Sequence, residues 1–166
     1  MVHVLEKAFN EHFVQTMVVA ALVIISTMLA IHFITYQPER FTGFGLLNGT
    51  EEAGPFPANV SYNAVLPLHT TVLNREGKTE LYRVNVIVGD ASTAVDAVYG
   101  VTGGTLLTSF DGITAEGQEW RQHVSLQFNE TLVGYKKIFF ELWIFDGSIF
   151  VFMNQTLHIW INILGP

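Results

Sequence analysis

The longest pattern in the chain is an apolar segment near its N-terminus. From Phe13 to Tyr36 the sequence contains no Asp, Glu, Lys or Arg. An α-helix of this length rises about 36 Å, enough to cross the ~30 Å hydrocarbon core of a bilayer. The segment has no polar stripe, which argues against a helix buried in a soluble core. Residues 13–36 are therefore predicted to form one transmembrane helix.

Other interpretations of this segment are a cleavable signal peptide and a pilin-like start. A signal peptide has an apolar region of about 7–15 residues and small residues at its cleavage site, whereas Met28 interrupts the small-residue pattern that ends at Ala30. Lys7-Ala8 only faintly resembles a pilin processing site, because no basic run precedes it. Residues 1–12 place apolar side chains at helical spacing and are expected to form a short cytoplasmic helical tail.

The remainder of the chain, residues 37–166, alternates apolar and polar residues in short segments, which is typical of strands with one buried face. Asp146-Gly147 lies between two such segments and is a strong hairpin signal. A Gly-containing turn at residues 74–78 predicts a second hairpin. The expected fold class is mainly β, with one N-terminal transmembrane α-helix followed by an immunoglobulin-like β-sandwich. The predicted strands are residues 41–47, 65–73, 81–88, 119–128, 135–145, 149–153 and 157–164.

Residues 89–117 differ from this pattern because they are rich in Gly, Ala, Ser and Thr. They have room for one or two short strands, such as Thr105–Ser109, within a long excursion. Long excursions are usually functional, ordered by a partner or flexible, and the sequence leaves this choice open.

Four Asn-X-Ser/Thr sequons follow the apolar helix, more than composition alone predicts. Their clustering favours a domain that carries N-linked glycans outside the cytoplasm, with the N-terminus inside and the protein anchored in the cell membrane by a single pass. The alternative is coincidence in a Thr-rich β protein. The sequon asparagines are Asn48, Asn59, Asn129 and Asn154.

Composition narrows the possible functions. Charged residues make up 14% of the chain, against about 25% in ordinary soluble domains. A net charge of −7 with only eight Lys and Arg residues excludes a basic nucleic-acid surface. The chain has no cysteine, which excludes disulfides, thiolate metal sites and cysteine nucleophiles.

No motif predicts catalysis, a metal site or a cofactor. The sequence lacks the G-x-S-x-G, Walker and H-E-x-x-H patterns. A metal site would have to be assembled from distant histidines, for example His69 and His158. The glycines of residues 100–104 have no following helix to cradle a phosphate, and Glu51 and Glu52 lack the spacing of a calcium loop. We expect a protein that is not an enzyme.

Three groups of residues in the β-rich part carry a resemblance. They are Phe41-Thr42 with the following Leu46-Leu47-Asn48-Gly49, Pro57 and Asn59; then Asn74, Glu76, Gly77, Tyr82 and Val84; and finally Phe140–Leu142, Asp146-Gly147 and Leu157–Asn162. With these residues the chain resembles a family of predicted membrane proteins, mostly archaeal, that share the domain of unknown function 1616. The resemblance covers most of residues 40–164 and implies an extracytoplasmic immunoglobulin-like domain. It implies no activity, because the family's function is unassigned. Members often carry several membrane helices, and residues 89–117 are longer here.

Aromatic residues break the expected alternation in the last two strands. Ile138, Phe140, Leu142 and Ile144 share one face of their strand, and Leu157, Ile159, Ile161 and Ile163 share one face of the last. If these aliphatic rows form the core, the outer face is crowded by Phe139, Trp143, Phe145 and Trp160. Either a loop such as residues 89–117 covers them, or membrane headgroups do, or they form a protein–protein interface.

The expected function is that of a non-catalytic accessory or structural subunit of a larger membrane or cell-envelope complex. It would bind membrane lipid through its helix and other membrane-protein subunits through the aromatic face. One alternative is a self-assembling surface filament or envelope-layer anchor, which would form homo-oligomers. Another is a carbohydrate-binding module in which Trp143 and Trp160 act as stacking platforms.

Overall fold

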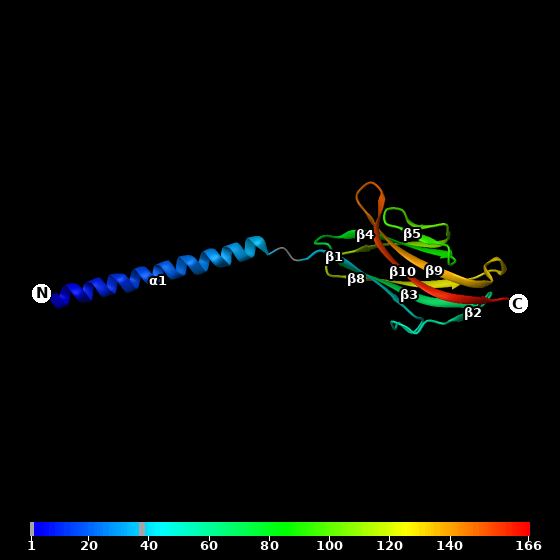
Figure 1. Cartoon of the computed structure of the whole chain (residues 1–166), viewed down its shortest axis with the longest axis horizontal. Helices are drawn as coiled ribbons and strands as arrows, with labels where there is room; N and C mark the ends of the chain where they lie inside the picture. The colour runs from blue at the N-terminus through cyan, green and yellow to red at the C-terminus, as the bar shows by residue number, and fades with distance from the viewer. Residues whose placement is uncertain (1, 37–38) are drawn as a thin grey trace. The chain divides into compact units, whose positions relative to one another are not determined.

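The computed structural model describes residues 2–36 and 39–166, with side chains of the helix described from residue 13. The chain divides into two compact units, residues 1–39 and 40–166, which are described separately (Figure 1). The first contains α1 (Val2–Thr35), which joins the predicted tail and transmembrane segment in one continuous helix. Residue 1 of the predicted tail and residues 37 and 38, at the predicted start of the second domain, lie outside the described residues.

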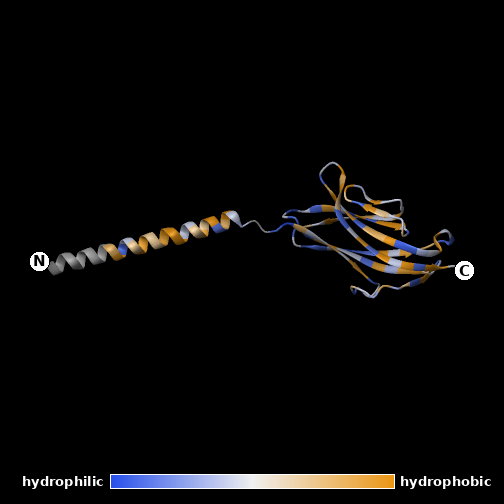
Figure 2. Ribbon diagram, in the orientation of Figure 1, coloured by the Kyte–Doolittle hydropathy of each residue, from blue (hydrophilic) through white to orange (hydrophobic). Residues whose placement is uncertain are grey.

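The part of α1 from Phe13 to Thr35 is long and apolar enough to cross a membrane once, and none of its most apolar window is buried. Figure 2 shows most of this part of the helix as hydrophobic. The hydroxyls of Ser26, Thr27 and Thr35 donate to backbone carbonyls four residues earlier, at 2.6, 2.7 and 2.7 Å. A hydroxyl satisfied by its own helix can enter hydrocarbon without an unpaired donor, so these residues fit a membrane span.

The second unit is a β-sandwich, and its described residues form two main sheets. The three-stranded sheet has the order β1-β3-β8, and the five-stranded sheet has the order β2-β10-β9-β4-β7. Neighbouring strands are antiparallel except β2 and β10, and β5 and β6 form a separate pair. The predicted mainly β, immunoglobulin-like class is confirmed. The elements are β1 (Phe41–Leu47), β2 (Asn59–Ser61), β3 (Val65–Arg75), β4 (Glu80–Gly89), β5 (Ala94–Asp96), β6 (Gly100–Thr102), β7 (Thr105–Thr114), β8 (Glu119–Gln127), the 3-10 turn η1 (Glu130–Leu132), β9 (Gly134–Phe145) and β10 (Phe150–Leu164).

The hydrophobic core lies between the two sheets. Every second residue of β3, β4, β9 and β10 points into it, as the two-residue period of a strand requires. The aliphatic rows predicted to face inward on β9 and β10 do so. Fully buried core residues include Leu68, Val72 and Val124 from one sheet and Val84, Ile138, Phe140, Leu142 and Ile161 from the other.

The two segments predicted at 149–153 and 157–164 form one strand, β10. Its pairing with β9 continues through an irregularity between Phe152 and Gln155, where Asn154 takes a left-handed φ of 54°. A bulge of this kind interrupts the alternation locally without ending the strand, which explains why the sequence pattern divides it in two. The hairpin predicted at Asp146-Gly147 is confirmed, since Phe145 pairs with Phe150 across it.

The hairpin predicted at residues 74–78 is wrong. β3 pairs with β1 and β8, whereas β4 pairs with β7 and β9. The turn is therefore an arch that carries the chain from one sheet to the other. Gly77 takes a φ of 81° in this arch, so the turn signal correctly marks a chain reversal while the two strands lie in different sheets.

A buried amide holds the arch in place. Asn74 is fully buried, and its Nδ2 donates to the carbonyls of Lys78 at 2.8 Å and Thr114 at 2.7 Å. Its Oδ1 accepts from the backbone N–H of Glu76 at 2.9 Å. The Asn74 backbone also bonds to the turn at residues 115–118. One side chain thus joins the β3–β4 arch to the end of β7, which belongs to the other sheet.

Replacing Asn74 with Ala should lower the free energy of unfolding by about 2–4 kcal/mol, because it leaves two carbonyls and one N–H without their partner. The measurement is chemical unfolding of the full-length chain in mild detergent. Asn162→Ala is the control, since that side chain makes one long contact of 3.3 Å at an exposed position. Equal losses in the two variants would contradict this role of Asn74.

Candidate binding face of the five-stranded sheet

A polar row crosses the outer face of the five-stranded sheet. Thr156, Glu141, Asn85 and Ser109 are paired in register on the adjacent strands β10, β9, β4 and β7. Ser109 Oγ donates to Asn85 Oδ1 at 2.9 Å. Glu141 is only 1% exposed although it points away from the core. A carboxylate at this depth needs hydrogen-bond donors, and these identify what covers the sheet.

Residues 90–104, which include β5 and β6, form a flap over this row; in Figure 1 they lie above β9 and β10, with β3 below. The backbone N–H of Val101 donates to Glu141 Oε1, and Trp143 Nε1 donates to Glu141 Oε2 at 3.2 Å. Gly100 has a φ of 75° and lies so close to the carboxylate that a Cβ would collide with it. The buried carboxylate therefore holds the flap against the sheet.

The flap changes the predicted aromatic interface. Phe139 and Trp143 do point to the outer face, but Phe139 is fully buried and Trp143 is half-buried. The Lys137 ammonium lies 4.6 Å from the Phe139 ring centroid, and the His158 ring lies 6.1 Å from it. An interface role for Phe139 is therefore wrong, because this chain itself covers its ring. At Glu141 and Trp143 the flap lies against the sheet, as in the predicted alternative in which a loop from residues 89–117 covers this face.

Lys137 also affects the imidazole of His158. Partial burial lowers the pKa of the His158 imidazole, and the nearby Lys137 ammonium lowers it further. His158 and His69, the example of two distant histidines that a metal site would need, lie on different sheets. His69 is on the outer face of the three-stranded sheet, where it pairs with His123.

Phe145 lies at the hairpin end of the outer face and is half-buried. Its ring centroid is 5.4 Å from that of Phe150, and the Arg83 guanidinium lies 3.9 Å from the Phe150 centroid. Arg83 also makes a two-pronged ion pair with Asp111, at 2.7 and 2.8 Å. These hydrogen bonds lower the pKa of the Asp111 carboxyl. Phe145 therefore belongs to a cation–aromatic cluster and exposes only part of its ring.

Trp160 is the one residue of the predicted aromatic set that the structure leaves clearly exposed, at 38%. It stacks against Tyr135, with ring centroids 5.6 Å apart and ring planes 26° apart. Tyr135 is 67% exposed. The sequence prediction missed Tyr135, although its spacing of four residues from Phe139 places it on the same strand face. The two rings form what we call the aromatic platform.

The four sequon asparagines lie in different settings. Asn59 lies in β2, Asn129 precedes η1, and Asn154 is the left-handed residue of the β10 bulge, all three exposed. Asn48 is half-buried, and its Oδ1 accepts hydrogen bonds from the N–H groups of Thr50 and Glu52. The amide of Asn48 is thus part of a turn, whereas the other three are open to solvent.

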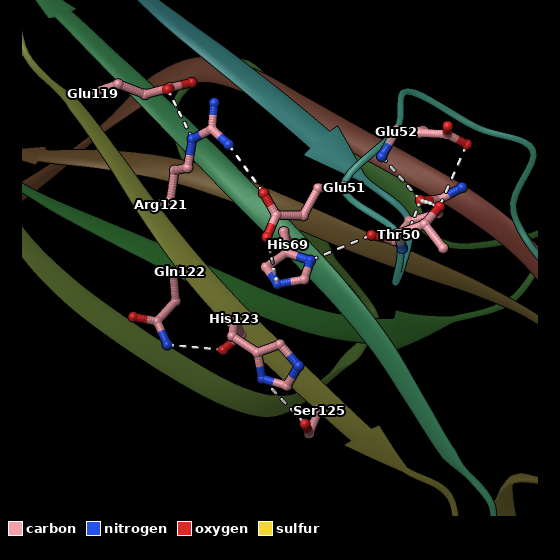
Figure 3. Close-up of polar contacts among 10 residues, drawn as sticks. Thr50, Glu51, Glu52, His69, Glu119, Arg121, Gln122, His123 and Ser125 are labelled. Atoms are coloured by element: carbon pink, nitrogen blue, oxygen red, sulfur yellow. Dashed lines mark hydrogen bonds and ion pairs between the residues drawn. The ribbon is translucent and has the colours of Figure 1, made fainter.

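The outer face of the three-stranded sheet carries a separate polar cluster (Figure 3). The rings of His69 and His123 are 4.9 Å apart. Glu51 lies 4.0 Å from His69 Nε2 and 3.1 Å from Arg121, which also pairs with Glu119 at 2.9 Å. In the part of the chain that the structure describes, no group of three or more His, Asp or Glu side chains could hold a metal ion. The cluster is an ion-pair network in which Glu51, Glu119 and Arg121 are exposed and His69 is half-buried.

No family model and no curated protein matches the chain. Among solved structures it is similar to the CARDB domain, in complex with di-metal ions, of a protein from Pyrococcus furiosus, at 13% identity and a TM-score of 0.49, covering 78% of this chain and 100% of that one. It is also similar to a β-glucosidase from Listeria innocua, at 12% identity and a TM-score of 0.43, covering 78% of this chain and 17% of that one. A third is Spo0M, a sporulation control protein from Bacillus subtilis, at 11% identity and a TM-score of 0.46, covering 76% and 50%. These similarities are weak.

Gly100→Ala should lift the flap, because the added Cβ collides with the Glu141 carboxylate. The expected result is tryptophan emission at longer wavelength, as Trp143 becomes exposed, together with faster proteolysis within residues 90–104. Gly103→Ala is the matched control, since Gly103 has a similar φ of 80° but open space around the Cβ position. If the two variants behave alike, backbone strain rather than the carboxylate contact is responsible.

Proposed function

We propose that this protein is a non-catalytic, single-pass subunit of a larger membrane or cell-envelope complex. The observation that carries this proposal is the unburied apolar surface of α1 between Phe13 and Thr35. Such a helix has no stable place in water and needs lipid or neighbouring membrane helices around it. The β-sandwich is the part that projects from the membrane.

An extracytoplasmic place for the β-sandwich and a cytoplasmic N-terminus are part of the proposal. They are supported by the exposure of Asn59, Asn129 and Asn154, since a sequon has to be open to solvent to be glycosylated. The resemblance to the archaeal family with the domain of unknown function 1616 is consistent with this placement. We propose that the chain belongs to that family.

The tip of the flap is the surface at which we propose that a partner binds. Val98 and Tyr99 are exposed there, Tyr99 at 75%. The Asp96 carboxylate accepts hydrogen bonds from the N–H groups of both residues, at 2.7 and 2.9 Å. A tip held in this way loses little conformational freedom on binding, and exposed aromatic side chains are enriched at interfaces. We expect a protein partner to contact this tip, with lipid or membrane subunits around α1.

A Val98→Ser/Tyr99→Ser variant should lose its partner during purification from native membranes in mild detergent. Loss of two apolar anchors weakens an interface by about 2–4 kcal/mol, or roughly 30-fold to 1,000-fold in Kd. Ile113→Ser is the matched control, because Ile113 is a large exposed apolar residue outside the flap. Unchanged co-purification of the double variant would contradict the flap-tip interface. Native mass spectra that show only copies of this chain would favour the self-assembling alternative.

A carbohydrate-binding module is the second candidate, and the aromatic platform favours it. Trp143 cannot serve as predicted, because it is half-buried and donates its indole N–H to Glu141. Tyr135 takes its place beside Trp160. If this function holds, the full-length protein binds saccharides on a glycan array, Trp160→Ser abolishes the signal and Tyr99→Ser preserves it. An array without signal would contradict this candidate.

A further inference from the structure

The sequon at Asn59 and the aromatic platform lie on the same face of the same sheet. Asn59 of β2 pairs with Asn162 of β10, and Asn162 pairs with Tyr135 of β9. Asn162 Nδ2 donates to Asn59 Oδ1 at 3.3 Å. The next residues along, Val60 and Ile163, are buried in the core, so Asn59 and Asn162 face outward. The asparagine that would carry a glycan is therefore two strands from one ring of the platform.

Trp160 lies closer still to the sequon. Because Asn162 is the direct partner of Asn59, Trp160 is the diagonal neighbour of Asn59 across these two parallel strands, at a Cα separation of about 8 Å. Leu164 is exposed beside Ser61, the third residue of the sequon. The sequon is thus bordered by apolar surface, while its own asparagine stays open to solvent.

We infer that an N-linked glycan on Asn59 folds back and packs on Tyr135 and Trp160. A pyranose ring presents an apolar C–H face, which stacks on an aromatic ring, and hydroxyls at its rim. The Lys137 ammonium, 5.5 Å from the Trp160 ring centroid, and the Asn162 amide lie beside the rings as partners for those hydroxyls. The spacing of adjacent strands, about 4.8 Å, places the rings within reach of the first sugars of the glycan.

This inference rests on the proposed extracytoplasmic location and deepens the proposed function. The sugar that the platform recognises is the protein's own glycan, attached in cis. A platform covered by the glycan is closed to a protein partner. Trp160 is then no longer part of the predicted protein interface, and the flap tip is the surface that a protein partner can reach. Asn154 offers a contrast, because it lies at the bulge of the same strand, roughly 25 Å along β10 from Asn162.

The test is a double-variant cycle on the full-length protein, produced in a host that N-glycosylates membrane proteins. Ser61→Ala removes the sequon without changing Asn59, and Tyr135→Ser removes the more exposed ring of the platform. Ser61→Ala should lower the Tm in mild detergent by about 2–5 °C in the wild-type background and by less than about 1 °C in the Tyr135→Ser background. A Trp160→Ser background provides a second cycle with the same expectation.

Two controls isolate the glycan. The same variants made in a host without N-glycosylation should show no Tm difference that depends on Ser61. Glycopeptide mass spectrometry should find a sugar on Asn59. An unmodified Asn59 beside a glycosylated Asn129 or Asn154 would overturn this inference alone, whereas sugar-free asparagines at all four sequons would also overturn the proposed topology. An equal effect of Ser61→Ala in all backgrounds would show that the glycan does not use the platform.

Discussion

A buried carboxylate on the outer face of the five-stranded sheet decides which parts of that face are accessible. Glu141 points away from the core, where a strand normally carries a solvated side chain, and it is nevertheless buried. Burial of an unpaired carboxylate costs several kcal/mol, so its oxygens have to be met by donors. One comes from its own strand, the indole N–H of Trp143, and the other is a backbone N–H from Val101. The second contact joins residues 40 positions apart in the chain and attaches the flap.

The aromatic excess on this face is divided by the flap into parts with different roles. Beneath and beside it, Phe139 and Trp143 extend the packing beyond the sandwich core. Away from it, Tyr135 and Trp160 remain open as a flat surface. At its tip, Val98 and Tyr99 project into solvent. The outer face of the sheet therefore offers one open aromatic surface, the platform, and the flap adds a second surface at its tip.

The sequence predicted local structure well and missed features that depend on distant contacts. The absence of charge between Phe13 and Tyr36 and the two-residue alternation of the strands were sufficient for the helix and the core faces. At residues 74–78 the turn signal correctly marks a chain reversal, but β3 pairs within one sheet and β4 within the other, and a local turn sequence does not specify these distant partners. The two-residue alternation of the strand was sufficient to predict that Phe139 points to the outer face. The burial of its ring did not follow from the alternation, because the His158 and Lys137 side chains that lie against its ring are brought there by the pairing and packing of the folded strands.

The irregularity in β10 leaves both faces of the strand unchanged. Phe152 pairs with Trp143 and Gln155 pairs with Leu142, so β10 advances three residues where β9 advances one. The two extra residues preserve the alternation, and both arms of β10 keep their outward side chains on the same face as those of β9. The side chains of Ile159 and Ile161 therefore stay in the core, and those of Trp160 and Asn162 stay on the outer face, although the strand is interrupted between its two arms.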